Sequence, residues 1–85
     1  MVEVRVYMTL RDKLGWRSKE IHLDKEIKFS ELLEKLRDLK EVLERFGYEN
    51  FMMLVNGRNI RLSKWLDTEV GEGDVVDIFP PAGGG

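Results

Sequence analysis

The residues best placed to do chemistry in this sequence are the glycines at its carboxyl end. The last six residues are Pro80-Pro81-Ala82-Gly83-Gly84-Gly85. A carboxylate that is to be activated must enter a narrow nucleotide site, and glycine, which has no Cβ, lets the backbone pass where a side chain would collide. Two prolines keep the preceding backbone extended, so the segment from Pro80 could reach about 20 Å. We therefore expect a domain over residues 1–79 and a flexible tail over 80–85, whose reactive group is the carboxylate of Gly85.

Few other side chains could carry catalysis or hold a metal. The sequence has no Cys and one His, His22, which takes the polar position between Ile21 and Leu23. Without Cys there is no disulfide, thiolate metal site or cysteine nucleophile, and one His cannot form a histidine cluster. We assign His22 to the solvated surface and expect no bound metal. No His-Ser or His-Asp pairing that could act as nucleophile and base is evident in the sequence.

Charge and composition argue against two classes of partner. Lys and Arg number 14 against 16 Asp and Glu, for a formal net charge of -2, so no overall cationic field would attract nucleic acid or an anionic membrane. Apolar residues make up 42% of the chain, which is ordinary for a folded domain. No run approaches the roughly 18 apolar residues of a membrane span, and no signal-peptide pattern opens the sequence. We expect a cytoplasmic protein that binds neither nucleic acid nor membrane.

The elements that would position the tail begin with a hairpin and a helix. Apolar and polar residues alternate over 2–10 and again over 19–23, which predicts two paired strands. Apolar residues then recur at three- and four-residue steps over 30–46, which predicts one amphipathic helix. Gly47 suits the left-handed residue that commonly follows a helix.

The second half of the sequence predicts three more strands. An apolar run over 51–55 reaches Asn56-Gly57, a dipeptide that favours a hairpin turn, and a short return strand follows over 58–62. A β-branched run over 75–79 must stop at Pro80, which cannot donate to a ladder. Together these elements predict an α+β fold: a mixed sheet of four to five strands with one main helix packed on one face.

Strand parity places four large apolar residues on the sheet face away from the helix: Tyr7, Met52, Leu54 and Phe79. Scattered surface apolar residues are normal, but four on one face favour an interface patch. We therefore predict that these residues bind a partner.

The whole pattern resembles the ubiquitin-like β-grasp fold, and its tail resembles that of the small, sulfur-carrying subunit of molybdopterin synthase. In that family a Gly-Asp turn precedes a hydrophobic strand, Pro-Pro, two variable residues and a closing Gly-Gly. The corresponding segments here are Gly73-Asp74, residues 75–79, Pro80-Pro81, Ala82-Gly83 and Gly84-Gly85. The layout resembles the family along nearly the whole chain, although Gly83 adds a third glycine where the family often has a larger residue.

The resemblance implies a sulfur carrier in molybdenum or tungsten cofactor biosynthesis. A partner related to the ubiquitin-activating enzymes would adenylate the Gly85 carboxylate with ATP, and a sulfur donor would convert it to a thiocarboxylate. The tail, threaded by Pro80, Pro81, Gly83 and Gly84, would then deliver sulfur to a pterin precursor in the large synthase subunit. The chain would bind no cofactor and would be a non-catalytic, sulfur-donating subunit of the complex.

Three alternatives stay open at this point. Gly85 could instead be conjugated to target lysines, as in ubiquitin-like protein modifiers. The chain could also carry sulfur in the thiamine pathway. In a third case it is a plain β-grasp interaction module with an inert tail.

Overall fold

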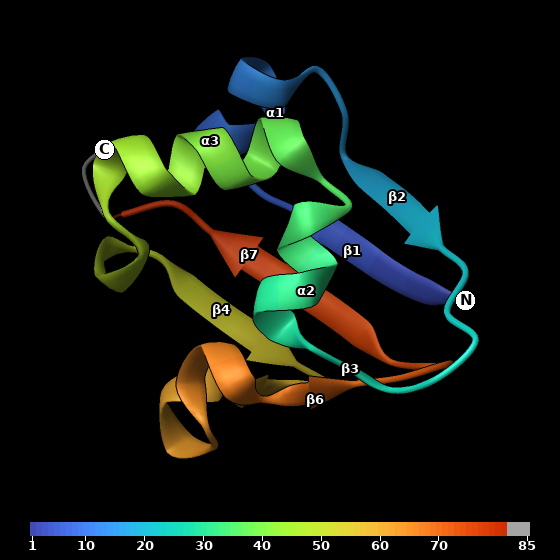
Figure 1. The fold of residues 1–85 in the computed structure, drawn as a ribbon. Coiled ribbons are helices and arrows are strands. Elements are labelled where there is room, and N and C mark those ends of the chain that lie inside the picture. The colour runs from blue at the N-terminus through green and yellow to red at the C-terminus, as the bar shows by residue number, and fades with distance from the viewer. Residues whose placement is uncertain (82–85) are drawn as a thin grey trace.

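A five-stranded mixed sheet forms the centre of the computed structural model, which describes residues 1–81 (Figure 1). The strands lie in the order β2-β1-β7-β4-β5 and comprise β1 (Val2–Val6), β2 (Ser18–Ile21), β4 (Met52–Val55), β5 (Arg58–Asn59) and β7 (Val75–Phe79). β1 is antiparallel to β2 and parallel to β7, and β4 is antiparallel to both β7 and β5. The segment that leads to the tail therefore starts from the central strand of the sheet.

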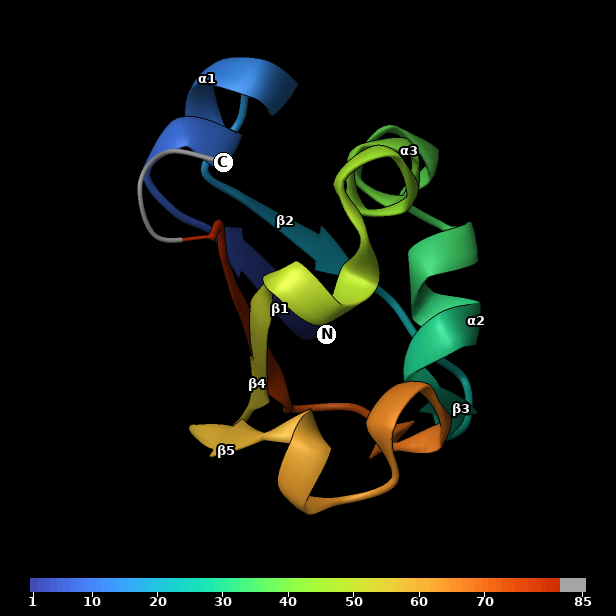
Figure 2. The same ribbon diagram turned by 90° about the vertical axis from the view of Figure 1, so that its left-hand side faces the viewer.

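The predicted α+β arrangement, a mixed sheet with helix packed on one face, is confirmed. Figure 2 shows α2 (Phe29–Glu34) and α3 (Arg37–Phe46) together on one side of the sheet. The core between them and the sheet is apolar, with Val4, Val6 and Ile78 from the strands and Phe29 and Leu39 from the helices each at 0% exposure. Each such side chain contributes about 1.5 to 3 kcal/mol of hydrophobic free energy when buried. Within residues 1–81, none of the helices has the length and apolar character that crossing a bilayer requires.

The single helix predicted over 30–46 is wrong, because the structure breaks it into α2 and α3. Leu36 leaves the helical region of backbone space, with φ -128° and ψ 69°, yet stays 3% exposed. The break turns α3 relative to α2, so both short helices pack on the twisted sheet (Figure 1). Leu32, Leu36 and Leu39 keep helical spacing across the break, which is why the sequence pattern did not reveal it.

The strand predicted over 2–10 is also too long. β1 ends at Val6, and a short helix, α1 (Thr9–Leu14), follows a positive φ of 55° at Met8. Leu10 is 1% exposed and reaches the core from this helix. Because Leu10 is apolar and buried, it extends the alternating pattern of the strand in the sequence, although the backbone leaves the strand after Val6. Gly15, with φ 80°, closes α1 by donating its N–H to the Arg11 carbonyl at 2.8 Å.

Several short elements complete the fold. β3 (Ile27–Lys28) and β6 (Glu69–Val70) pair as a second, two-stranded sheet that was not predicted. The predicted strand over 58–62 ends at Asn59, and that over 19–23 is found at 18–21. Single 3-10 turns are formed by η1 (Tyr48–Asn50), η2 (Ile60–Leu62) and η3 (Trp65–Asp67). Two-residue strands are too short to leave a period in the sequence, which explains the omission.

Candidate functional site

The root of the tail lies at the end of β7. Phe79 is the last residue of the strand, and Pro80 and Pro81 follow it, both partly buried. The predicted tail residues Gly83 and Gly84 and the reactive Gly85 lie outside the described residues. The structure therefore defines where the tail starts, and the reactive carboxylate stays a prediction.

The four apolar residues predicted for an interface lie together on one face of the sheet. Met52 is the cross-strand partner of Phe79, and Leu54 pairs with Asp77 two residues further along the same strands, on the same face. The Tyr7 ring stacks on the Phe79 ring with centroids 4.2 Å apart and an interplanar angle of 9°. Met52 is 44% exposed, and the other three apolar side chains are partly buried. We call this surface, with Arg5 and Asp77 at its centre, the outer face; its role in docking is still a prediction.

An ion pair that sequence reasoning missed lies at the centre of the outer face. Arg5 donates from Nε to Asp77 Oδ1 at 2.7 Å and from Nη2 to Oδ2 at 3.1 Å. The Tyr7 hydroxyl donates to Asp77 Oδ1 at 2.6 Å. Asp77 is only 7% exposed, so it depends on these partners for its hydrogen bonds. The sequence does show that Arg5 and Asp77 carry opposite charges and occupy outward-facing positions of the first and last strands. Only the pairing of β1 with β7 brings them together.

The electrostatics of this cluster fix its protonation. The hydrogen bond from Arg5 is the main cause that holds the pKa of Asp77 below its usual range, with the Tyr7 hydroxyl adding to it against the effect of burial. The same carboxylate raises the pKa of Tyr7. At neutral pH Asp77 is thus ionised and the Tyr7 hydroxyl is a proton donor. Because Tyr7 is anchored by this bond, its ring is held against Phe79 at the root of the tail.

Asp77→Asn is expected to lower the free energy of unfolding by about 1 to 2 kcal/mol at neutral pH, because it removes a charge-assisted pair whose Arg5 end is 43% exposed to water. The folded-state pKa of Asp77 lies below its unfolded value of about 3.9, so its contribution is present above that pH and is lost as pH falls through the folded pKa. Urea titrations of both proteins from neutral to acid pH measure the difference. A difference in the free energy of unfolding that stays constant into acid would contradict this assignment. Asp12→Asn, at an exposed residue of α1, serves as control.

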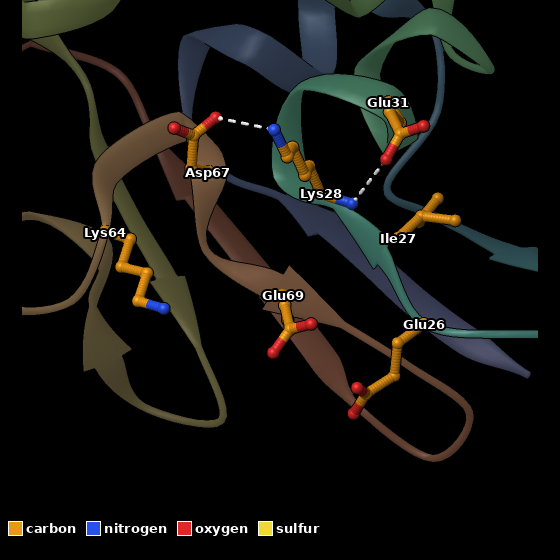
Figure 3. A pocket seen from close by; sticks show the side chains of 7 residues that line it. All are labelled: Glu26, Ile27, Lys28, Glu31, Lys64, Asp67 and Glu69. Carbon is orange, nitrogen blue, oxygen red and sulfur yellow. Dashed lines mark hydrogen bonds and ion pairs between the residues drawn. The ribbon is translucent and has the colours of Figure 1, made fainter.

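Within residues 1–81 no other ion pair buries its carboxylate as deeply as Asp77. His22 is exposed, with Nε2 at 3.0 Å from Asp24 Oδ1. Within residues 1–81 no group of three His, Cys, Asp or Glu side chains could hold a metal ion. An open cavity of about 450 Å³ lies where α2, η3 and the β3–β6 pair meet (Figure 3). It is lined by Glu26, Glu31, Asp67, Glu69, Lys28 and Lys64, of which Lys28 already contacts Asp67 at 3.6 Å.

Solved structures define the class of protein to which this fold belongs. Small archaeal modifier protein 1 from Methanosarcina acetivorans aligns with a TM-score of 0.76 at 27% identity, over 99% of this chain and 95% of that one. A Pyrococcus furiosus structure named "Putative molybdopterin converting factor, subunit 1" aligns with a TM-score of 0.72 at 26% identity, over 95% and 97% of the two chains. The fold is that of the ubiquitin-like β-grasp proteins.

Sequence comparison assigns the family within that class. Residues 4–85 match the profile of the ThiS family, and the chain belongs to this family, in the sulfur-carrier branch of the ubiquitin-like proteins. It is also 43% identical over 51 residues to a protein of Archaeoglobus fulgidus named "Putative sulfur carrier protein". That match spans 58% of this chain and 58% of the length of the relative.

Proposed function

We propose that this chain is a sulfur carrier, which accepts sulfur on the carboxylate of Gly85 and donates it to a biosynthetic acceptor. The observation that carries the proposal is the match to the ThiS family, because it runs from residue 4 through the closing glycines to residue 85. The structure adds that the tail is rooted on a central strand, beside an apolar face with a partly buried aromatic stack.

The chemistry proceeds by two substitutions, the first at the α-phosphorus of ATP and the second at the carboxyl carbon of Gly85. In an enzyme related to the ubiquitin-activating enzymes, a Gly85 carboxylate oxygen attacks the α-phosphorus of ATP, and pyrophosphate leaves. A hydrosulfide donor then attacks the resulting acyl adenylate, a C–S bond forms, and AMP leaves with the C–O bond electrons. The chain supplies no catalytic side chain in either step. Its part is to present an unhindered carbonyl on an arm of glycines, which have no Cβ to block the approach.

For the acceptor, we propose a pterin precursor in molybdenum or tungsten cofactor synthesis. The chain would then be the non-catalytic small subunit of molybdopterin synthase and would dock on the large subunit. Its likeness to the Pyrococcus furiosus structure, whose name gives subunit 1 of a molybdopterin converting factor, supports this choice. Thiocarboxylated chain mixed with the large subunit and precursor should return to its original mass as sulfur leaves. Retention of the sulfur under these conditions would argue for another acceptor.

Docking is expected to use the outer face. Its charges at the centre are already paired, since Asp77 accepts both from Arg5 and from Tyr7, so a partner can cover them at little cost. Met52 and Phe79 add apolar surface beside this pair. Aromatic residues are common anchors of protein interfaces, and the stacked Tyr7 and Phe79 rings lie beside the central ion pair. A partner seated here would lie directly over the root of the tail.

Phe79→Ala and Tyr7→Ala should each lower affinity for the activating enzyme and for the large synthase subunit by about thirtyfold, since buried aromatic anchors commonly contribute about 2 kcal/mol. Calorimetric titration and thermal melts of each variant separate docking from folding. Val42→Ala is the matched control, because Val42 is a partly buried apolar residue on α3, across the sheet. A lowered melting temperature with unchanged affinity would assign both rings to the fold alone.

A ubiquitin-like protein modifier is the second candidate, favoured by the likeness to the Methanosarcina acetivorans modifier protein. It would use the same activated Gly85, with a lysine amine of a target in place of hydrosulfide as the nucleophile. A thiamine-pathway carrier would share the thiocarboxylate and differ only in the enzyme that takes the sulfur. Activation of Gly85 is therefore the step on which all three functions depend.

A further inference from the structure

We propose a second docking surface on this chain, formed by Arg58, Arg61, Leu62 and Trp65, that binds an acidic segment of a partner protein carrying an apolar side chain. We call it the basic edge surface. It comprises the edge strand β5 and the segment that follows it, away from the end of β7 (Figure 2, yellow to orange). The proposal is independent of the sulfur-carrier function, because neither the outer face nor the tail takes part in it.

Positive charge is concentrated in this segment. Between Asn56 and Leu66 there are three cationic residues and no Asp or Glu, in a chain whose formal net charge is -2. Lys64 lines the cavity of Figure 3 together with Asp67 and Glu69, so its charge faces carboxylates. Arg58 and Arg61 form no ion pair with any carboxylate within residues 1–81. Between Asn56 and Leu66, these two guanidinium groups are therefore the cations left to bind a partner.

Both guanidinium groups are held in place by neutral acceptors. Arg58 donates from Nη2 to the Leu62 carbonyl oxygen at 2.7 Å, and Arg61 donates from Nη2 to the Glu49 carbonyl oxygen. The guanidinium carbon of Arg61 lies 4.5 Å from the centroid of the Trp65 ring. Carbonyl and aromatic partners orient an arginine without cancelling its charge, and the remaining N–H groups can bind a carboxylate. Less side-chain freedom is lost when such preset groups bind a partner.

Apolar surface accompanies these charges. Leu62 is 69% exposed, although it follows the fully buried Ile60 by only two residues. An open hollow of about 340 Å³ is lined by Glu49, Arg61 and Trp65. Trp65 holds a positive φ of 54°, which is costly for a bulky side chain and persists only where the surroundings enforce it. The strained turn keeps the indole beneath Arg61, beside the hollow.

Complementarity identifies the occupant as an acidic protein segment. Arg58 and Arg61, which pair with no carboxylate within residues 1–81, call for carboxylates, whereas the exposed Leu62 and the hollow beside Trp65 each offer contact to an apolar side chain. A nucleic acid would offer phosphates for the arginines but would leave the exposed Leu62 uncovered. Because the surface is separate from the outer face, a partner bound here could stay attached while the activating enzyme or the acceptor occupies the outer face.

Titration of a short, end-blocked peptide of alternating Glu and Leu into the labelled full chain, followed by amide NMR shifts, tests the proposal. Saturable shifts are expected at 58–65, with the amides of Tyr7 and Met52 unmoved. Arg58→Ser and Leu62→Ser should each weaken binding about tenfold and leave the melting temperature unchanged, because neither side chain is in the core. Lys35→Ser, at an exposed lysine on the α2 C-cap, is the control and should bind normally.

Four results would each overturn the proposal. They are the absence of saturable binding, shifts centred on the outer face, equal binding of a peptide with Lys in place of Glu, and tighter binding of a single-stranded RNA at the same amides. Higher salt should weaken peptide binding, since partly exposed charges are screened.

Discussion

Deletion of Gly85, or addition of one residue after it, is expected to abolish sulfur loading and leave the fold unchanged. The reaction takes place at one carbonyl carbon, and its distance from the docked outer face is set by the length of the tail. Within residues 1–81 the buried core residues run from Val2 to Ile78, and all of them precede Pro80. Sulfur loading should therefore be lost completely, and the free energy of unfolding should hardly change.

Circular dichroism and intact mass, after incubation with activating enzyme, ATP and sulfide, make this measurement. The unchanged chain treated in parallel is the positive control, and titration with the activating enzyme shows whether docking is retained. Normal loading of either variant would mean that the reactive group is not the Gly85 carboxylate.

Gly84→Ala is expected to slow adenylation by about five- to hundredfold, because an added methyl in a closely packed site commonly costs about 1 to 3 kcal/mol. In the proposed function the penultimate residue would pass the narrowest part of the activating site, where the surrounding atoms would have little room to relax. Docking should be almost unchanged, since we propose that it uses the outer face with Tyr7 and Phe79 as anchors.

Gly83→Ala is the matched control, because it adds the same methyl one residue earlier, at a position that varies in the family the tail resembles. Pyrophosphate-exchange rates for both variants, measured with their affinities for the activating enzyme, make the comparison. Equal rates, or a loss of affinity equal to the loss of rate, would show that the tail is not threaded through a narrow site.

Local patterns predicted the parts of the fold that depend on local chemistry. The Asn56-Gly57 turn is present, with φ of 51° and 82° at the two residues, and it joins β4 to β5 as expected. β7 ends at Phe79, where Pro80 removes the next donor. The parity of Tyr7 and Phe79 was also correct, which is why their outward position could be inferred before the strands were paired.

The features that could not be predicted from the sequence depend on contacts between residues far apart in the chain. The Arg5–Asp77 pair spans 72 positions and forms only because β1 and β7 are neighbours. The break at Leu36 follows from packing two helices on a twisted sheet, and the apolar spacing continues through it unchanged. Charge on the outer face was therefore overlooked, and one helix was expected where there are two.

The central claim is that Gly85 carries sulfur, and the intact mass of the chain isolated from its native cells tests it most directly. Replacement of the terminal OH by SH adds about sixteen mass units, so a species heavier by that amount than the chain ending at Gly85 is expected. Alkylation of the thiocarboxylate should shift that species alone. A chain found only with an unmodified carboxylate, only as larger conjugates, or with a different final residue would contradict the account.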